Sequence, residues 1–134
     1  MAVVKTDRLG LHSSRDILTV RNVVRMWAAD LGFNLVDQTK MITAASELAR
    51  NTVDYGGGGD VVLEMLNDLS RRGLRLTFAD QGPGIPNIEL ALKDGYTTGN
   101  GLGLGLGGSR RLVNDFKIES EPGKGTRVSI TRWK

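Results

Sequence analysis

The stretch ASELARNTVDYGG, residues 45–57, combines an apolar helix pattern with a carboxylate and an amide four positions apart. Glu47 and Asn51 stand at i and i+4, so a helix places both side chains on one face. The simpler interpretation is a stripe in contact with water, where Glu47 forms an ion pair with Arg50 at i and i+3. The alternative is a reaction site. An asparagine oxygen suits Mg²⁺, and a carboxylate one helical turn away can orient or deprotonate an attacking hydroxyl.

A glycine-rich stretch, GNGLGLGLGG at residues 99–108, is the second unusual feature. Glycine is entropically costly in ordered structure, so this density favours a backbone that approaches a ligand closely. Phosphate at the beginning of the next helix is the usual ligand, because free N–H groups and the helix dipole both attract an anion. A flexible linker is the alternative, but the interleaved leucines favour burial. No strand precedes the loop and no Gly-Lys-Ser/Thr follows, so neither a dinucleotide fold nor a Walker loop is expected.

Asp80 ends an apolar strand pattern and enters the sequence DQGPGI. Aspartate favours turns, which is one explanation of its position. In the other explanation, Asp80 faces a pocket and accepts a hydrogen bond from an amino group such as that of adenine. Gly82 and Gly84 would then allow the chain to pass close beneath a flat base.

The periodicity of apolar residues predicts an alternation of strands and helices. Ser13 and Asp16 resemble a capping box that begins the first helix, Gly32 ends it, and Asp37 is expected to cap the second helix. Strands are expected at 2–11, 60–68 and 74–80 and as two strands within 117–133; helices are expected from Ser13 to Gly32, from Asp37 to about Tyr55, at 88–93 and at 109–116; turns are expected at 70–74 and 122–125. This order predicts helices on one face of a mostly antiparallel sheet.

Composition excludes several classes of function. The 134 residues predict a single domain, 1–134, and the absence of cysteine fits a reducing cytoplasm. The net charge of +3 is scattered and only 5% of residues are aromatic, so no nucleic-acid partner is expected. No apolar run is long enough to cross a bilayer, which predicts a cytoplasmic protein with no membrane partner. His12 is the only histidine and is expected to be a surface or strand residue, because a lone histidine is a poor basis for a metal site or a catalytic triad.

Taken together, the motifs E-x-x-x-N, D-x-G-x-G and G-x-G-x-G-L resemble the Bergerat-type (GHKL) ATP-binding family, which includes gyrase, histidine kinases and MutL. The stretches VDQTKMITAASELARN, ADQGPGIP, DGYTTGNGLGLGL and GKGT resemble, more closely, the small serine/threonine kinases of bacterial partner-switching systems such as the stressosome. Anti-sigma-factor kinases are more distantly similar. The fold implied is an α+β, two-layer α/β sandwich with helices on one face of a mostly antiparallel mixed sheet.

The resemblance implies ATP and Mg²⁺ as cofactors and assigns a role to individual residues. Glu47 is implied as catalytic base toward a substrate serine, Asn51 as the Mg²⁺ ligand, Asp80 as the reader of the adenine amino group, and Thr126 as a support of the adenine. Other nucleotide-binding positions implied are Gly82, Gly84, Ile85, Thr97, Thr98, Gly101, Leu102, Gly103, Leu104, Gly105 and Leu106. The lid before the glycine loop has no arginine, so three candidates stay open for the cation beside the γ-phosphate: Arg50, Lys93 and Arg110.

The resemblance also implies protein partners. A STAS-domain antagonist is expected as substrate, and a downstream regulator such as a PP2C-type phosphatase is expected to be activated on release. A sensor kinase is not expected, because His12 precedes the first helix and no dimerising hairpin carries a phospho-accepting histidine. The competing hypothesis is an ATP-binding module that sequesters a regulator such as a sigma factor with little or no kinase turnover. Glu47 favours the kinase, since a pure binder needs no base.

Overall fold

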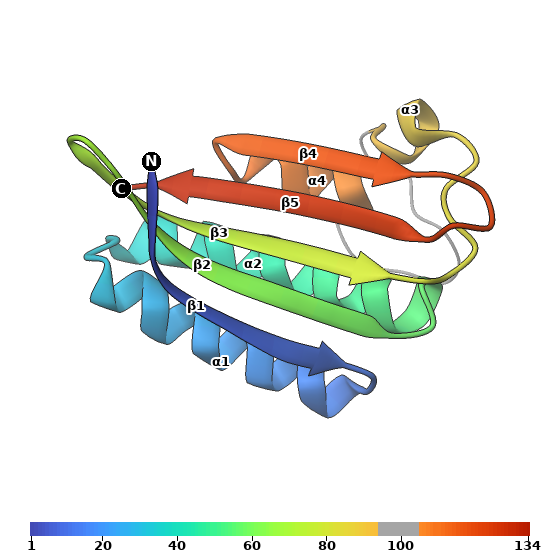
Figure 1. Cartoon of the computed structure of the whole chain (residues 1–134), viewed down its shortest axis with the longest axis horizontal. Coiled ribbons are helices and arrows are strands. Elements are labelled where there is room, and N and C mark those ends of the chain that lie inside the picture. The colour runs from blue at the N-terminus through green and yellow to red at the C-terminus, as the bar shows by residue number, and fades with distance from the viewer. Residues whose placement is uncertain (94–104) are drawn as a thin grey trace.

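A five-stranded antiparallel sheet forms the frame of the molecule, as the computed structural model of residues 1–93 and 105–134 shows (Figure 1). The strands are β1 (Ala2–Leu11), β2 (Gly59–Asp68), β3 (Arg71–Asp80), β4 (Asp115–Ser120) and β5 (Thr126–Trp133), in the spatial order β1-β2-β3-β5-β4. The helices are α1 (Ser14–Asp30), α2 (Leu35–Arg50), α3 (Ile88–Ala91) and α4 (Gly105–Arg111), and a π-helical turn, η1 (Asn51–Tyr55), continues α2. The predicted α+β, two-layer fold is confirmed, and each strand pairing in the described residues is antiparallel.

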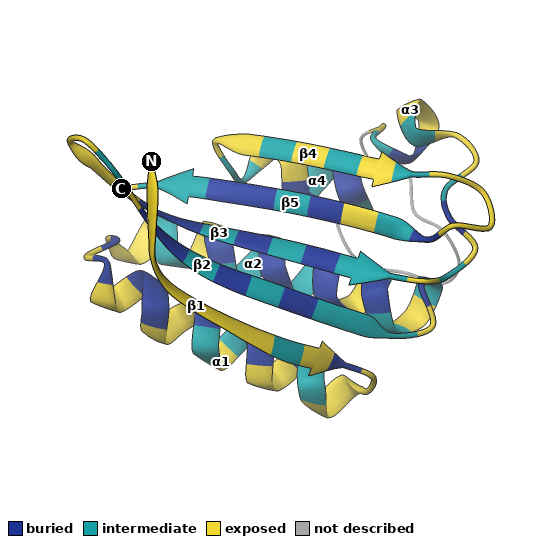
Figure 2. Ribbon diagram, in the orientation of Figure 1, coloured by how far each residue is buried: buried dark blue, intermediate teal, exposed yellow. Residues whose placement is uncertain are grey.

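The core lies between the sheet and the layer that contains α1, α2 and α4 (Figures 1 and 2). Alternate residues of the central strands are buried on the helix side, because successive side chains of a strand point to opposite faces. Buried strand residues include Val61, Leu63, Leu74, Leu76, Phe78, Val128 and Ile130, and they pack with Val20, Val24, Met41, Ala45 and Leu48 of the helices. No helix in the described parts of the chain combines the length and the apolar character that crossing a bilayer requires.

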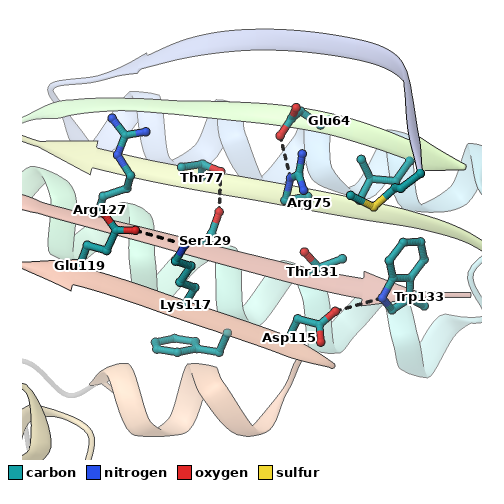
Figure 3. A pocket seen from close by; sticks show the side chains of 13 residues that line it. Glu64, Arg75, Thr77, Asp115, Lys117, Glu119, Arg127, Ser129, Thr131 and Trp133 are labelled. Carbon is teal, nitrogen blue, oxygen red and sulfur yellow. Dashed lines mark hydrogen bonds and ion pairs between the residues drawn. The ribbon is translucent and has the colours of Figure 1, made fainter. Parts of the chain in front are cut away.

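The opposite face of the sheet carries polar side chains that bond to one another (Figure 3). Arg75 donates to Glu64 at 2.8 Å, and the hydroxyls of Thr77 and Ser129 lie 2.7 Å apart. The hydrogen bond to Glu64 raises the pKa of the Arg75 guanidinium above its ordinary value. These residues line a shallow hollow of about 510 Å³ on this face. Asp80 and Thr126 of the predicted site lie elsewhere, at one end of the sheet.

The first helix begins and ends as predicted, whereas the second helix begins earlier. Ser13 caps α1 by accepting from the N–H of Asp16, and Gly32 follows its end at a φ of +86°. The prediction that Asp37 caps α2 is wrong: Asn34 is the cap, and its Oδ1 accepts from the N–H of Asp37 at 2.8 Å. The Asp37 carboxylate instead forms an ion pair with Arg132 of β5 at 2.5 Å. Both residue types cap helices, and the helix here begins at the earlier of the two.

The turn between β2 and β3 is tighter than the predicted 70–74. Asp68 pairs with Arg71, so only Leu69 and Ser70 form the turn, with Leu69 at a φ of +50°. Gly73 was part of the predicted turn, but it lies within β3. A Cβ there would stand 2.6 Å from the ring of Trp133, so this glycine makes room for a neighbouring aromatic side chain.

The predicted helix at 109–116 is displaced in the structure. Helix α4 begins at Gly105, inside the glycine-rich stretch, and ends at Arg111. Strand β4 begins at Asp115, and the predicted helical residue Phe116 pairs with Ile130 across the β4–β5 ladder. The strand pairing overrides the helical pattern, because Phe116, partly buried on β4, packs against the core cluster. The helix predicted at 88–93 is present as the shorter α3.

Candidate nucleotide site

A row of polar side chains crosses the end of the sheet. Asp80 ends β3 and pairs with Thr126 at the beginning of β5, which pairs in turn with Ser120 at the end of β4. Directly paired residues on antiparallel strands point to the same face. Since Asp80 stands two positions after buried Phe78, and Thr126 two positions before buried Val128, the row faces the helix layer. On the helix side of the sheet, buried apolar residues are therefore replaced by polar residues at this end of the strands.

Two hydrogen bonds hold the loop that follows β3 against this row. The N–H of Gly82 donates to Asp80 Oδ1 at 2.9 Å, and the N–H of Ile85 donates to Ser120 Oγ at 2.8 Å. The predicted turn role of Asp80 is thus real, but it occupies only one carboxylate oxygen. Among the described residues, the other oxygen, Oδ2, has no hydrogen-bond partner.

The glycines of this loop permit close contact with neighbouring backbone. A Cβ on Gly84, whose φ is +77°, would stand 2.0 Å from the carbonyl oxygen of Glu121. A Cβ on Gly82 would stand 2.6 Å from the carbonyl oxygen of Gly56. Only glycine fits these positions, so both are required to seat the loop even before a ligand is considered.

Glu47 and Asn51 lie together at the end of α2, as their spacing predicts. The N–H of Asn51 donates to the carbonyl oxygen of Glu47, and the chain then widens into η1, where the N–H of Gly56 donates to Asn51 O at 2.9 Å. Single π-turns of this kind are frequent at functional sites. The predicted Glu47–Arg50 ion pair is present at 3.6 Å, yet the Glu47 side chain is only 14% exposed. The carboxylate is therefore not a freely hydrated part of a surface stripe.

The two parts of the site meet because η1 packs against β2 and β3. Tyr55, at the end of η1, donates its hydroxyl proton to the carbonyl oxygen of Gly84 at 3.0 Å. This bond ties the helix that carries Glu47 and Asn51 to the loop that follows Asp80. A Cβ on Gly56 would stand 2.4 Å from Asp80 Cγ, which shows how closely η1 and β3 approach each other.

The phosphate-binding prediction falls only partly on described residues. Helix α2 contacts α4, whose first residues are Gly105, at a φ of +68°, and the buried Leu106. Thr97, Thr98, Gly101, Leu102, Gly103 and Leu104 lie outside the described residues. The three candidate cations, Arg50, Lys93 and Arg110, are all exposed.

Sequence reasoning missed two residues of this site, Tyr55 and Ser120. The position of Ser120 could have been predicted, because a hairpin with its turn at 122–125 aligns Ser120 with Thr126. Tyr55 stands four positions after Asn51 on the same helical run, directly before the glycine loop. Its bond to Gly84 joins segments 29 positions apart, and a contact of that separation has no local signal in the sequence.

The oxygen atoms of these residues fit the adenine amino group and the Mg²⁺ ion that the motifs imply. Asp80 and Thr126 present oxygen acceptors at one position, which suits an amino group on a base. Within residues 1–93 and 105–134, no cluster of three His, Cys, Asp or Glu side chains is arranged to hold a metal ion. Mg²⁺ often takes only one or two protein ligands beside substrate phosphates, so a single amide oxygen from Asn51 is compatible with it.

Comparison with known proteins defines the class. The model of the family described as histidine kinase-, DNA gyrase B-, and HSP90-like ATPase matches residues 36–134, and this chain belongs to that family. Within it, the chain is 43% identical to the serine/threonine-protein kinase RsbT of Bacillus subtilis over 118 residues, 88% of this chain and 89% of the relative. This similarity confirms the predicted enzyme class, the protein serine/threonine kinases.

An anti-sigma F factor of Clostridium acetobutylicum is 33% identical over 131 residues, 91% of this chain and 88% of the relative. Among solved structures, the RsbU and RsbW domains of a Mycobacterium tuberculosis protein match with a TM-score of 0.66 and 21% identity. That match covers 98% of this chain and 33% of the solved chain, so this chain spans about a third of it. The mycobacterial sensor histidine kinase MprB matches with a TM-score of 0.54 and 16% identity, over 96% of this chain and 97% of the other. Both structures support the fold.

Proposed function

We propose that this protein transfers the γ-phosphoryl group of ATP, with Mg²⁺, to a serine or threonine of a STAS-domain antagonist protein. The observation that carries the proposal is the meeting of two units at one end of the sheet. One is the acceptor row of Asp80 and Thr126, and the other is the pair of Glu47, whose side chain is 14% exposed, and the half-buried Asn51, on α2 and η1. The first unit is suited to binding the adenine ring, and the second is suited to phosphoryl transfer. The contact of η1 with β3 brings the two units together.

The residues of the chain divide the chemistry between them. Asp80 Oδ2 accepts from the adenine amino group while Oδ1 stays bonded to the loop. Gly105 and Leu106 begin α4, where free backbone N–H groups suit the phosphates. Glu47 accepts the proton of the attacking hydroxyl, and its limited exposure keeps competing water away. Mg²⁺, held through the oxygen of Asn51, supplies charge neutralisation on the phosphates when bound.

The names of the relatives support a role in partner switching. The matched Bacillus protein is named a serine/threonine-protein kinase, and several other matches are named anti-sigma F factors. We therefore propose partner switching: phosphorylation of the STAS antagonist releases this protein, which then activates a downstream regulator such as a PP2C-type phosphatase.

The competing function is an ATP-binding module that sequesters a sigma factor, and the likeness to anti-sigma F factors favours it. Incubation of the protein with labelled ATP, Mg²⁺ and a panel of STAS proteins separates the two functions. The kinase transfers label to one serine or threonine of a panel member, and chelation of Mg²⁺ abolishes the transfer. Stable binding to a sigma factor with no labelled panel member contradicts the proposal.

A further inference from the structure

Ser120 stands at the centre of the polar row, although none of the sequence motifs includes it. Its Oγ lies 2.8 Å from the N of Ile85, 3.1 Å from the carbonyl oxygen of Gly125 and 2.8 Å from Thr126 Oγ1. One hydroxyl therefore joins the loop after Asp80, the turn before β5 and the first side chain of β5.

One assignment of the hydroxyl protons satisfies all three contacts at once. A serine hydroxyl has one proton to donate and can accept through its lone pairs. The carbonyl oxygen of Gly125 can only accept, so the Ser120 proton goes there. The backbone N–H of Ile85 can only donate. If all three contacts are hydrogen bonds at once, the third runs from Thr126 to Ser120, because Ser120 has no second proton.

This direction determines what Thr126 offers to a ligand. With its only proton donated to Ser120, Thr126 Oγ1 can present only lone pairs to the space beside it. Asp80 is its direct neighbour in the β3–β5 register, and a carboxylate is also an acceptor. Both side chains that face the ligand position are thus acceptors.

We propose that Ser120 is a positioning residue for nucleotide selection: it directs the Thr126 proton away from the ligand and so favours a base with an amino group. Adenine carries an amino group where guanine carries a carbonyl oxygen. The carbonyl oxygen of guanine has no proton to donate, so it leaves Asp80 and Thr126 without a hydrogen-bond partner. A site built from two acceptors therefore discriminates strongly between adenine and guanine. The inference rests on the proposed function, because it takes ATP as the ligand.

Direct binding of Mg-ATP and Mg-GTP to the full chain, measured by titration calorimetry, tests the role of Ser120 without using kinase activity. In Ser120→Ala the Thr126 hydroxyl is free to rotate and donate, so the ATP-to-GTP affinity ratio falls roughly 3- to 10-fold. The matched control Ser120→Thr keeps a hydroxyl and retains the wild-type ratio. Thr126→Val removes the directed hydroxyl and also lowers the ratio, and adding Ser120→Ala to it lowers the ratio no further, because the two residues act as one unit.

An equal loss of ATP and GTP affinity in Ser120→Ala overturns the inference, since Ser120 then only supports the loop. If Ser120→Ala does not fold, Thr126→Val decides, because it leaves the Ser120 bonds to Ile85 and Gly125 in place. An unchanged ratio in Thr126→Val overturns the inference. The proposed kinase function fails separately, when a wild type that prefers ATP transfers no phosphate to any STAS protein.

Discussion

At the scale of single residues, Asp80, Thr126 and Glu47 each have a bond or ion pair within the fold as well as a proposed function. Asp80 is the plainest case, because one carboxylate oxygen holds Gly82 and the other has no partner among the described residues. A substitution that removes the whole side chain would disturb both the loop and the ligand. The informative substitution changes only the free oxygen.

Asp80→Asn meets that requirement. The amide oxygen keeps the bond from the Gly82 N–H, while the NH₂ group replaces the oxygen that faces the adenine amino group. We expect ATP affinity to fall by about 1–3 kcal/mol, since a donor then meets a donor, and stability to change by less than about 1 kcal/mol. Calorimetric titration with ATP and urea unfolding of the same variant measure the two effects. Unchanged ATP affinity would remove Asp80 from the adenine position.

At the scale of elements, the sequence predicted the order of strands and helices because the apolar periodicity matched the buried faces. Its errors share a physical cause. Asp37 was expected to cap a helix, but it pairs with Arg132 of β5. Phe116 was expected within a helix, but it pairs with Ile130 of β5. Neither partner is close in sequence. The motifs indicated Glu47, Asn51 and Asp80 as site residues, and the structure packs η1, which follows Glu47, against β3, which ends at Asp80. They did not predict the Tyr55 and Ser120 bonds that join the motifs to one another.

The contact between α2 and β5 gives a prediction about stability. Arg132 donates to Asp37 and to the carbonyl oxygen of Leu112, and its side chain is 14% exposed. Asp37→Ala leaves this guanidinium partly buried without its carboxylate, so the free energy of unfolding should fall by about 1–3 kcal/mol.

Urea titration followed by circular dichroism measures this change. The matched control is Asp30→Ala at the end of α1, where the aspartate is exposed and has no ion pair in the described parts of the chain. The control should shift stability by no more than about 0.5 kcal/mol. Equal effects of the two substitutions would show that the Asp37–Arg132 pair contributes nothing specific.

At the scale of the whole molecule, the family match begins at residue 36, yet β1 and α1 belong to the same sheet and core. Strand β1 pairs with β2 along nearly its full length, and Leu11, Trp27 and Ile130 share one cluster of buried residues. We propose that residues 1–134 form a single domain and unfold as one cooperative unit.

Two tryptophans allow this to be tested. Trp27 reports on α1 and Trp133 on the end of β5, so the variants Trp133→Phe and Trp27→Phe each leave one reporter. Within each variant, the fluorescence and circular dichroism transitions in urea should coincide, as two-state unfolding requires. A separate early transition of Trp27 would mean that the N-terminal segment is an independent unit.

Single-turnover transfer from Mg-ATP to a STAS substrate, compared between the wild type and Glu47→Ala, shows whether Glu47 acts as the base in phosphoryl transfer to a partner protein. If it does, the transfer rate falls by about 10²–10⁴-fold in the variant. ATP affinity should be retained, because Asp80, Asn51 and Thr126 remain. Transfer at the wild-type rate would contradict the assignment of Glu47 as the base. Its ion pair with Arg50 would then be its only role.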